Sequence, residues 1–359
     1  MKNNNKIKFK LNDTEVEAFV GESIWQVAKR EGETIPHLCH ADEPGYRSDG
    51  NCRACMVEID GEQVLAASCI REPVEGMKVN TQSNKAKKAR KTVFELLSAD
   101  QPNREKHPDP VSNFWEWTDK LDIKEDKFPK IKDVPIDNSH PAMHVNIDAC
   151  INCNLCVRAC REVQVNDVIG MSYRGHGSKI TFDFDDEMAE SSCVACGECV
   201  QACPTGALIE KTLVNEEGVR NNYADKIVNS LCPYCGVGCQ TKVHVKDNKI
   251  VYVDGRNGPA NNQRLCVKGR FGFDYISSDN RLLKPLIRKE DAPKDRFILD
   301  KDKKVGDYYR EASWEEAIFL SAKGFLEILE NKGSSALCGF GSAKGSNEEA
   351  YLFQKLIRT

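Results

Sequence analysis

The chain has 359 residues, of which 40% are hydrophobic and 30% are charged, so it holds enough apolar material for two or more domains. No stretch approaches the roughly 18 consecutive apolar residues of a membrane span, and MKNNNKIKFK lacks an apolar secretory core, which favours a soluble cytoplasmic protein without a membrane span. A formal net charge of −4 argues against a nucleic-acid partner, and seventeen cysteines in a reducing compartment indicate metal ligation rather than disulfides.

The beginning of the chain predicts a small mixed sheet with one helix. KIKFKL and EVEAFV alternate apolar and polar residues around a turn at Asn12, which predicts a β-hairpin. Ser23 begins a capping box for a short helix. Two further strands, around MVEI and VLAA, flank the hairpin dipeptide Asp60-Gly61. We therefore expect a β-grasp domain over residues 1–80.

Four cysteines lie on the loops of this expected domain. The polar, glycine-containing stretch GYRSDGNCRAC lets backbone N–H groups point at sulfur atoms, as a [2Fe–2S] cluster requires. Twelve residues separate the first two cysteines, whereas the plant ferredoxin pattern has four. The expected ligands are Cys39, Cys52, Cys55 and Cys69.

Residues 81–139 are expected to form a helix and a linker with a short aromatic-rich helix. SNKAKKARKTVFELL predicts a helix with an apolar face, and its basic residues either are solvated or dock an electron-accepting subunit. The expected apolar face is Ala86, Ala89, Val93, Leu96 and Leu97, and the basic residues are Lys85, Lys87, Lys88, Arg90 and Lys91. His107 has no cysteine nearby in the sequence, and we expect it to lie on the surface.

Residues 140–212 contain the cysteine repeat CINCNLCVRAC and CVACGECVQACP. This is the bacterial ferredoxin spacing, in which three cysteines hold one [4Fe–4S] cluster and the fourth ligates the other cluster. One expected set is Cys150, Cys153, Cys156 and Cys203, and the other is Cys193, Cys196, Cys199 and Cys160. Paired CxxC units also suit zinc, but three thiols at two-residue intervals make an unusual zinc ribbon. Arginines next to cluster ligands either tune the cluster potentials or are simply solvated; they are Arg158, Arg161, Arg264 and Arg270.

Residues 225–290 contain CPYCGVGC and a further cysteine 27 positions after its last one. The segments TKVHV and KIVYV predict a hairpin around Asp247-Asn248. The fourth expected ligand set is Cys232, Cys235, Cys239 and Cys266, which leaves Cys338 outside all sets.

Residues 305–359 predict the start of an α/β domain. Ser313 caps a helix that Gly333 ends, and the strand ALCGF leads into the turn GSAKG and a helix capped by Ser346. A strand, a glycine turn and a helix N-terminus can hold a phosphate, although an ordinary βα loop has the same pattern.

These motifs together resemble the molybdopterin oxidoreductase superfamily and, within it, the alpha subunit of cytoplasmic, NAD-linked formate dehydrogenases. The cysteine spacing of the first domain resembles the N-terminal domain shared with the large subunit of respiratory NADH dehydrogenase and some hydrogenases. The resemblance implies an α+β multidomain fold: a β-grasp [2Fe–2S] domain, a two-[4Fe–4S] domain, a molybdopterin oxidoreductase [4Fe–4S] domain and the start of an α/β domain. It also implies a bis(molybdopterin guanine dinucleotide) cofactor with molybdenum or tungsten, near Lys268, Gly341 and Lys344.

The implied function is electron transfer during the oxidation of formate to CO2, with electrons passing through one [2Fe–2S] and three [4Fe–4S] clusters to a diaphorase-like subunit or NAD. The alternative is an electron-transfer subunit of a complex I-like or hydrogenase-like, NADH-linked complex. Relatives often bind an extra cluster through one histidine and three cysteines; no cysteine lies between Cys69 and Cys150, so we expect none here. In the family the metal-ligating cysteine or selenocysteine comes shortly after the position of Thr359, so we expect no catalytic residue in this chain.

Overall fold

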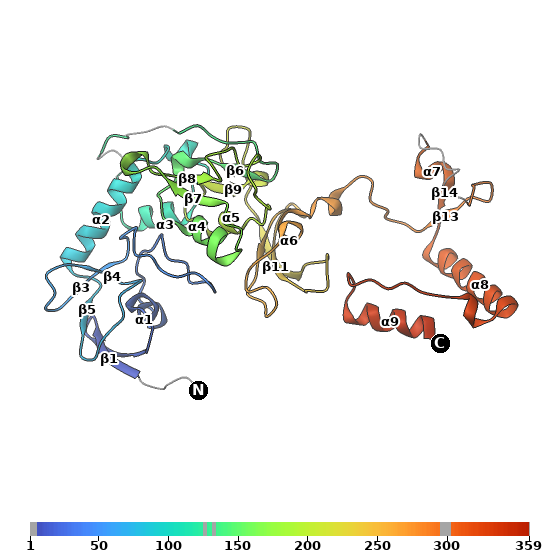
Figure 1. Cartoon of the computed structure of the whole chain (residues 1–359), viewed down its shortest axis with the longest axis horizontal. Helices are drawn as coiled ribbons and strands as arrows, with labels where there is room; N and C mark the ends of the chain where they lie inside the picture. The colour runs from blue at the N-terminus through green and yellow to red at the C-terminus, as the bar shows by residue number, and fades with distance from the viewer. Residues whose placement is uncertain (1–5, 125–127, 131–133, 295–302, 359) are drawn as a thin grey trace. The chain divides into compact units, whose positions relative to one another are not determined.

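A computed structural model of the protein describes residues 6–124, 128–130, 134–294 and 303–358 (Figure 1). Within these ranges the chain divides into two compact units. The first comprises the described residues of Met1–Cys232 and Gly238–Gly272, and the second those of Pro233–Val237 and Phe273–Thr359. None of the described helices combines the length and apolar character needed to cross a bilayer.

The first unit begins with a five-stranded mixed sheet and one helix, as the alternation pattern predicts. The strand order is β2-β1-β5-β3-β4, in which β1 and β5 pair in parallel and the other neighbours pair antiparallel. Asn12 adopts a left-handed φ of 55° in the first hairpin, a conformation that asparagine tolerates well. The elements are β1 (Lys6–Leu11), β2 (Thr14–Phe19), α1 (Ile24–Arg30), β3 (Met56–Ile59), β4 (Ala66–Ala67) and β5 (Lys78–Asn80).

The two-residue alternation of apolar and polar side chains determines which residues form the core of this sheet. Phe9 and Leu11 are buried on β1, while the alternating lysines face solvent. Helix α1 buries Ile24 and Val27 against the sheet, and each such side chain contributes about 1.5–3 kcal/mol through burial. The predicted capping box is present, because the Ser23 hydroxyl accepts from the Gln26 N–H and the Gln26 side chain accepts from the Ser23 N–H.

Two helices, α2 (Asn84–Ala99) and α3 (Asn113–Lys120), follow the sheet. The buried stripe of α2 differs from the predicted one, because it runs through Ala86, Arg90 and Phe94 and leaves Leu96 half-exposed. The expectation that Arg90 lies on the solvated basic face is therefore wrong. Its Nε donates to the carbonyl of Met56 on β3 at 2.8 Å, which satisfies one donor of this buried guanidinium.

His107 is fully buried, so the prediction of a surface histidine is wrong. Its Nε2 lies 3.0 Å from Gln101 Oε1, and its Nδ1 accepts from the Asp109 N–H at 3.1 Å. The ring packs edge-on against Trp115, with centroids 5.4 Å apart. Burial lowers the pKa of His107 to about 4, so the imidazole is neutral at physiological pH. The residue is thus a core histidine with satisfied ring nitrogens.

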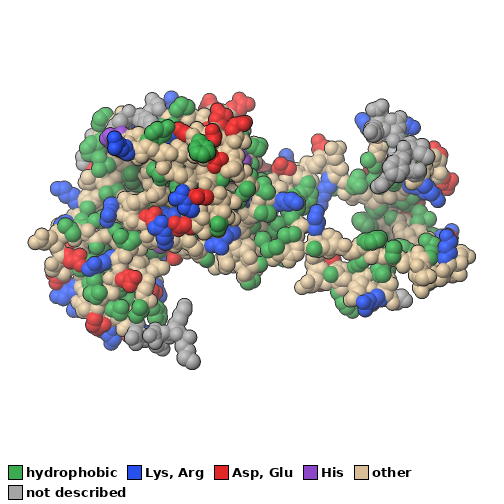
Figure 2. Space-filling view, viewed as in Figure 1, with side chains coloured by type: hydrophobic (Ala, Val, Ile, Leu, Met, Phe, Trp, Pro, Cys, Tyr) green, Lys and Arg blue, Asp and Glu red, His purple; other side chains and the backbone are tan. Residues whose placement is uncertain are grey.

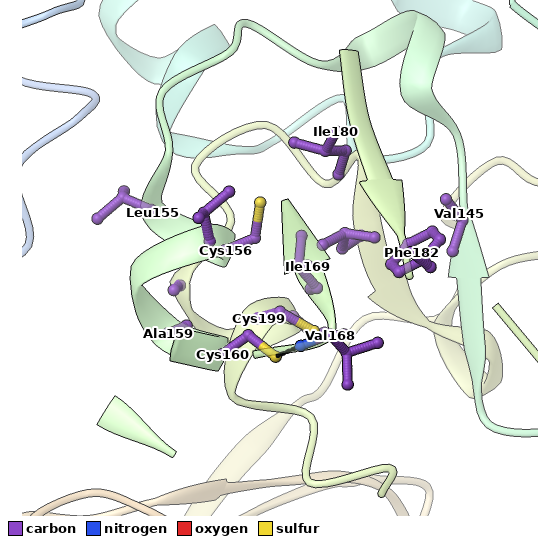
Figure 3. Packing of buried hydrophobic residues seen from close by; sticks show 14 of the residues in the cluster. Val145, Leu155, Cys156, Ala159, Cys160, Val168, Ile169, Ile180, Phe182 and Cys199 are labelled. Atoms are coloured by element: carbon purple, nitrogen blue, oxygen red, sulfur yellow. Dashed lines mark hydrogen bonds between the residues drawn. The ribbon is translucent and has the colours of Figure 1, made fainter. Parts of the chain in front are cut away.

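The cysteine repeat lies in a small α+β segment with its own core (Figure 3). Two antiparallel strand pairs, β6 with β9 and β7 with β8, flank two short helices that carry cysteines. The elements are β6 (Met143–Val145), α4 (Leu155–Arg158), the π-helical turn η4 (Ala159–Val163), β7 (Ile169–Ser172), β8 (Lys179–Phe182), α5 (Glu198–Ala202) and β9 (Leu208–Glu210).

The last part of the first unit is a three-stranded antiparallel sheet with a short helix. The strands are β10 (Lys226–Leu231), β11 (Gln240–Lys246) and β12 (Lys249–Gly255), and the helix is α6 (Val267–Phe271). The predicted hairpin is confirmed: Asp247 and Asn248 connect β11 and β12, with positive φ angles of 48° and 60°.

The second unit contains β13 (Leu286–Arg288), α7 (Val305–Tyr308), β14 (Tyr309–Glu311), α8 (Trp314–Lys332) and α9 (Asn347–Arg358). The predicted caps of α8 and α9 at Ser313 and Ser346 are present. Among the described residues of α8 and α9 none is buried, and hydrophobic side chains lie exposed on this unit (Figure 2).

The segment ALCGF is not a strand, which corrects the predicted strand–turn–helix pattern. A strand requires a hydrogen-bonding neighbour, and in the described part of this unit only β13 and β14 pair.

Candidate iron-sulfur centres

The first candidate centre lies at the loops that surround β3. Cys39, Cys55 and Cys69 are buried, and Cys52 is partly buried. Backbone N–H groups point at two of the sulfurs, because Cys39 N–H donates to Cys52 Sγ at 3.4 Å and Cys52 N–H donates to Cys39 Sγ at 3.5 Å. Thiol hydrogen bonds from Cys52 and Cys69 lower the pKa of Cys39. The Cys55 thiol joins this group through a hydrogen bond with Cys69, so the four thiols are connected. Backbone N–H groups that donate to sulfur are of the kind that stabilise cluster thiolates.

The long segment between Cys39 and Cys52 contacts the other cysteine-bearing parts of the unit. Tyr46 Oη donates to Glu198 Oε1 at 3.0 Å, which joins this segment to α5. The guanidinium of Arg264, near Cys266, donates to the Pro44 carbonyl at 3.2 Å. The twelve-residue spacing that departs from plant ferredoxins thus gives the loop enough length to reach two neighbouring domains.

The two ferredoxin motifs adopt the same local backbone conformation. We call Cys150, Cys153 and Cys156 the first cysteine loop, and Cys193, Cys196 and Cys199 the second cysteine loop. Asn152 and Ala195 occupy equivalent places and both have a φ of 53°. Asn154 and Gly197 are also equivalent, with φ angles of 63° and 71°. A repeated run of left-handed residues turns the backbone around each set of sulfurs.

Equivalent amides also point at equivalent sulfurs. Asn152 N–H donates to Cys150 Sγ at 3.4 Å, and Ala195 N–H donates to Cys193 Sγ at 3.3 Å. Val168 N–H donates to Cys160 Sγ at 3.3 Å, the dashed line in Figure 3. Such N–H···S bonds favour the charged thiolate form that iron requires.

The fourth cysteine of each motif lies with the loop of the other motif. Figure 3 shows Cys160 next to Cys199, while the Cys156 sulfur lies apart from both. Burial, together with a smaller effect of the nearby Cys203 thiol, raises the pKa of Cys150 to about 12. Burial also raises the pKa of Cys199 well above its usual value, and Cys160 adds to this. Each loop is therefore electrostatically coupled to the distant cysteine.

These buried thiols fit a metal cluster better than they fit the free state. Burial strongly raises the pKa of Cys153 and Cys156, because a bare thiolate would be an unpaired charge in an apolar site. Iron supplies the positive charge that would let such thiols ionise, with release of protons on binding. In the described part of the chain, no three histidine, cysteine or acidic side chains converge on a point that would hold a single metal ion.

Three of the four predicted ligands of the last candidate centre, Cys232, Cys239 and Cys266, belong to the first unit. Cys232 N–H donates to the Cys239 carbonyl at 2.8 Å, and Cys266 is the N-cap residue of α6. A Cβ on Gly269 would lie 3.5 Å from Cys232 Sγ, so the Cys232 sulfur lies against α6. The remaining predicted ligand, Cys235, is exposed and belongs to the second unit.

The predicted pterin-site residues are exposed. Lys268 lies on α6 in the first unit. Gly341 and Lys344 belong to the second unit, where the Lys344 N–H donates to Ser342 Oγ at 3.2 Å. Cys338, which the sequence leaves outside all ligand sets, is also exposed.

The structure adds two buried arginines that the sequence left undecided. Arg158 on α4 is 2% exposed and Arg270 on α6 is 0% exposed, whereas Arg161 is exposed and pairs with Asp167. Arg270 Nε donates to the carbonyl of Cys196 at 2.8 Å, and its guanidinium pairs with Asp254. In the sequence, only the nearness of these arginines to ligand cysteines indicated that they could be buried. Arginine is rarely buried without specific partners, and those partners lie elsewhere in the chain.

Comparison with known families identifies three domains in the described order. The chain matches the 2Fe-2S iron-sulfur cluster binding domain over residues 4–84, the 4Fe-4S dicluster domain over residues 149–207, and the molybdopterin oxidoreductase Fe4S4 domain over residues 225–278. The predicted fold class, a mixed α+β multidomain chain with these three kinds of cluster-binding domain, is confirmed.

Among curated proteins, the chain is 31% identical over 391 residues to "Probable oxidoreductase YjgC" of Bacillus subtilis, covering 97% of this chain and 37% of that protein. It is 29% identical over 393 residues to "Putative formate dehydrogenase SH0748" of Staphylococcus haemolyticus, with the same coverages. The chain thus spans little more than a third of the length of these relatives.

Among solved structures, the chain is similar to one chain of the NAD+-reducing [NiFe]-hydrogenase in the H2-reduced state. The TM-score is 0.51 at 25% identity, and the match covers 60% of this chain and 92% of the other. Together, the domain matches and the relatives identify the chain as related to the N-terminal iron–sulfur region of formate dehydrogenase-like molybdopterin oxidoreductases.

Proposed function

We propose that the chain is the electron-transfer portion of a formate dehydrogenase-type oxidoreductase, holding one [2Fe–2S] and three [4Fe–4S] clusters. The observation that carries this proposal is the repeated conformation of the two cysteine loops, each with a distant fourth cysteine and a matching N–H···S bond. Iron–sulfur clusters, when bound, accept and donate single electrons.

The proposed ligand sets are those that the spacing predicts. The [2Fe–2S] ligands are Cys39, Cys52, Cys55 and Cys69; the ferredoxin sets are Cys150, Cys153, Cys156 with Cys203, and Cys193, Cys196, Cys199 with Cys160; the last set is Cys232, Cys235, Cys239 and Cys266. The coupling of Cys203 to the first cysteine loop and of Cys160 to the second supports the crossed sets.

The protein matrix around these sites does two things. It limits the access of water, because four of the eight ferredoxin cysteines are buried in one apolar cluster with residues such as Ile169 and Phe182, and three more pack against that cluster. It also supplies amide donors, which stabilise negative charge on sulfur and thereby set the cluster potentials. Lys268, two residues after Cys266, is proposed to offset negative charge between the last cluster and a pterin cofactor.

The formate-type assignment rests on the relatives and on the molybdopterin oxidoreductase Fe4S4 domain. Formate oxidation to CO2, a bis(molybdopterin guanine dinucleotide) with molybdenum or tungsten near Lys268, Gly341 and Lys344, and a diaphorase-like partner are parts of the same proposal. The second candidate, a subunit of a hydrogenase-like complex linked to NAD, is favoured by the likeness to the NAD+-reducing [NiFe]-hydrogenase.

Metal analysis of the assembly purified anaerobically from its native cells separates these candidates. We expect about fourteen irons per chain, from one two-iron and three four-iron centres, together with molybdenum or tungsten. Iron accompanied by nickel, without molybdenum or tungsten, would instead favour the hydrogenase-like complex. Stoichiometric zinc with little iron would refute both.

A further inference from the structure

The buried Arg158 lies between two candidate cluster sites. It belongs to α4, two residues after Cys156 and two before Cys160, and is 2% exposed. A guanidinium at this depth is strongly unfavourable unless its donors and its charge are matched. Its partners therefore show what holds it there.

The partners of Arg158 come from both cysteine-bearing loops. A single nitrogen, Nη2, donates to the carbonyl of Cys39 at 2.7 Å and to the carbonyl of Cys153 at 3.3 Å. Cys39 is a proposed ligand of the [2Fe–2S] cluster, and Cys153 is a proposed ligand of the adjacent [4Fe–4S] cluster. The other nitrogen, Nη1, donates to the carbonyl of Arg47.

The charge of Arg158 is only partly offset. Asp49 Oδ2 lies 3.4 Å from its Nε, but the same carboxylate is shared with the guanidinium of Arg47. Arg158 therefore brings a positive charge into a region of low dielectric constant, where charges interact more strongly than in water.

We propose that Arg158 is a positioning residue that couples the [2Fe–2S] centre to the [4Fe–4S] centre of the first cysteine loop; this rests on the proposed cluster assignments. Its hydrogen bonds fix the two ligand loops relative to each other. Its charge stabilises the reduced form of both centres, because each gains one negative charge when it takes up one electron. One residue at this junction thus acts both on the positions of the two ligand loops and on the potentials of both centres.

The neighbouring Arg161 provides a matched control. It lies three residues further along the same helical segment, immediately after Cys160, but its side chain is 54% exposed and pairs with Asp167 at 2.5 Å. Removal of its charge is screened by solvent and should leave both potentials nearly unchanged.

The test is a potentiometric titration of the full chain with loaded clusters, followed by EPR, with dithionite as reductant. Arg158→Gln should lower the equilibrium constant for one-electron reduction of each centre about tenfold, which corresponds to a reduction potential lower by about 59 mV. Arg161→Gln should leave both potentials nearly unchanged. Arg158→Lys should retain most of the potential but weaken the magnetic interaction between the two reduced centres, since lysine lacks the bridging fork. Asp49→Asn should raise both potentials.

The outcomes separate this inference from the proposed function. Absence of iron in the unmodified chain would refute the cluster assignment itself. Full iron content in all variants with unchanged potentials and unchanged magnetic interaction would overturn the role of Arg158 alone. If Arg158→Gln does not fold, Asp49→Asn decides, because unchanged potentials in that variant would refute the electrostatic coupling.

Discussion

Replacing Gly197 with alanine should destabilise the second cysteine loop. Gly197 has a left-handed φ of 71°, which disfavours any residue with a Cβ atom. An added Cβ would lie 2.0 Å from Arg270 Cδ and 2.9 Å from Phe271 Cζ, well inside contact distance. Arg270 cannot move aside freely, because its guanidinium donates to the Cys196 carbonyl and to Gln201 Oε1.

The expected magnitude combines two separate terms. The left-handed conformation costs an alanine about 1–2 kcal/mol, and forcing a methyl group into a packed site costs about 1–3 kcal/mol. The loss of stability should therefore be about 2–5 kcal/mol. For a unit of this size, a central value of about 3 kcal/mol corresponds to a fall of roughly 6–12 °C in the unfolding midpoint.

The assay is the loss of visible cluster absorbance on heating, compared at one scan rate because such unfolding is irreversible. Gly61→Ala isolates the backbone term, since Gly61 has a φ of 81° and open space around its Cβ position. Gly170→Ala has neither penalty. In an Arg270→Ala background, the effect of Gly197→Ala should become smaller. A Gly197→Ala midpoint equal to that of Gly170→Ala would show that neither the left-handed backbone nor the contact with Arg270 restricts this position.

Three further predictions follow from the same structure. Cys160→Ala should remove the cluster of the second cysteine loop, and Cys203→Ala that of the first, by iron content and EPR; loss of each motif's own cluster would reject the crossed ligand sets. Burial holds the pKa of His107 at about 4, against an ordinary value of 6.5, so the unfolded state binds more protons than the folded state between these pH values. The free energy of unfolding should therefore fall by about 3 kcal/mol, relative to His107→Gln, as the pH drops from 6.5 to 4. Parallel curves of stability against pH for both proteins would contradict this. Trp314 and Phe319 are 70% and 67% exposed, so the chain should bind a hydrophobic fluorescent dye, and Phe319→Ser should reduce that binding; equal dye binding by both proteins would count against it.

The features that the sequence predicted well are those decided by neighbouring residues. Turn chemistry places Asn12 and the pair Asp247-Asn248 in hairpins, and capping chemistry begins α1 at Ser23. The sequence also predicts that Cys39, Cys52, Cys55 and Cys69 lie on loops of the first domain, and the structure has all four outside its helices and strands.

The features that the sequence missed depend on distant contacts. His107 is buried because Trp115 and Gln101 come together around it, which no local pattern reveals. Arg90 and Arg158 are buried because carbonyl oxygens from distant parts of the chain, Met56 on β3 and Cys39 on a loop, accept their hydrogen bonds. The segment ALCGF has the composition of a strand, but composition cannot provide the neighbouring strand.

Low-temperature EPR of the dithionite-reduced protein, with spin quantification, determines whether this chain holds four separate iron–sulfur centres. We predict four reducible centres per chain, one of the [2Fe–2S] type and three of the [4Fe–4S] type, with about fourteen irons in total. Protein that is fully folded and loaded with metal, yet EPR-silent after reduction and free of iron, would show that the chain does not hold these centres.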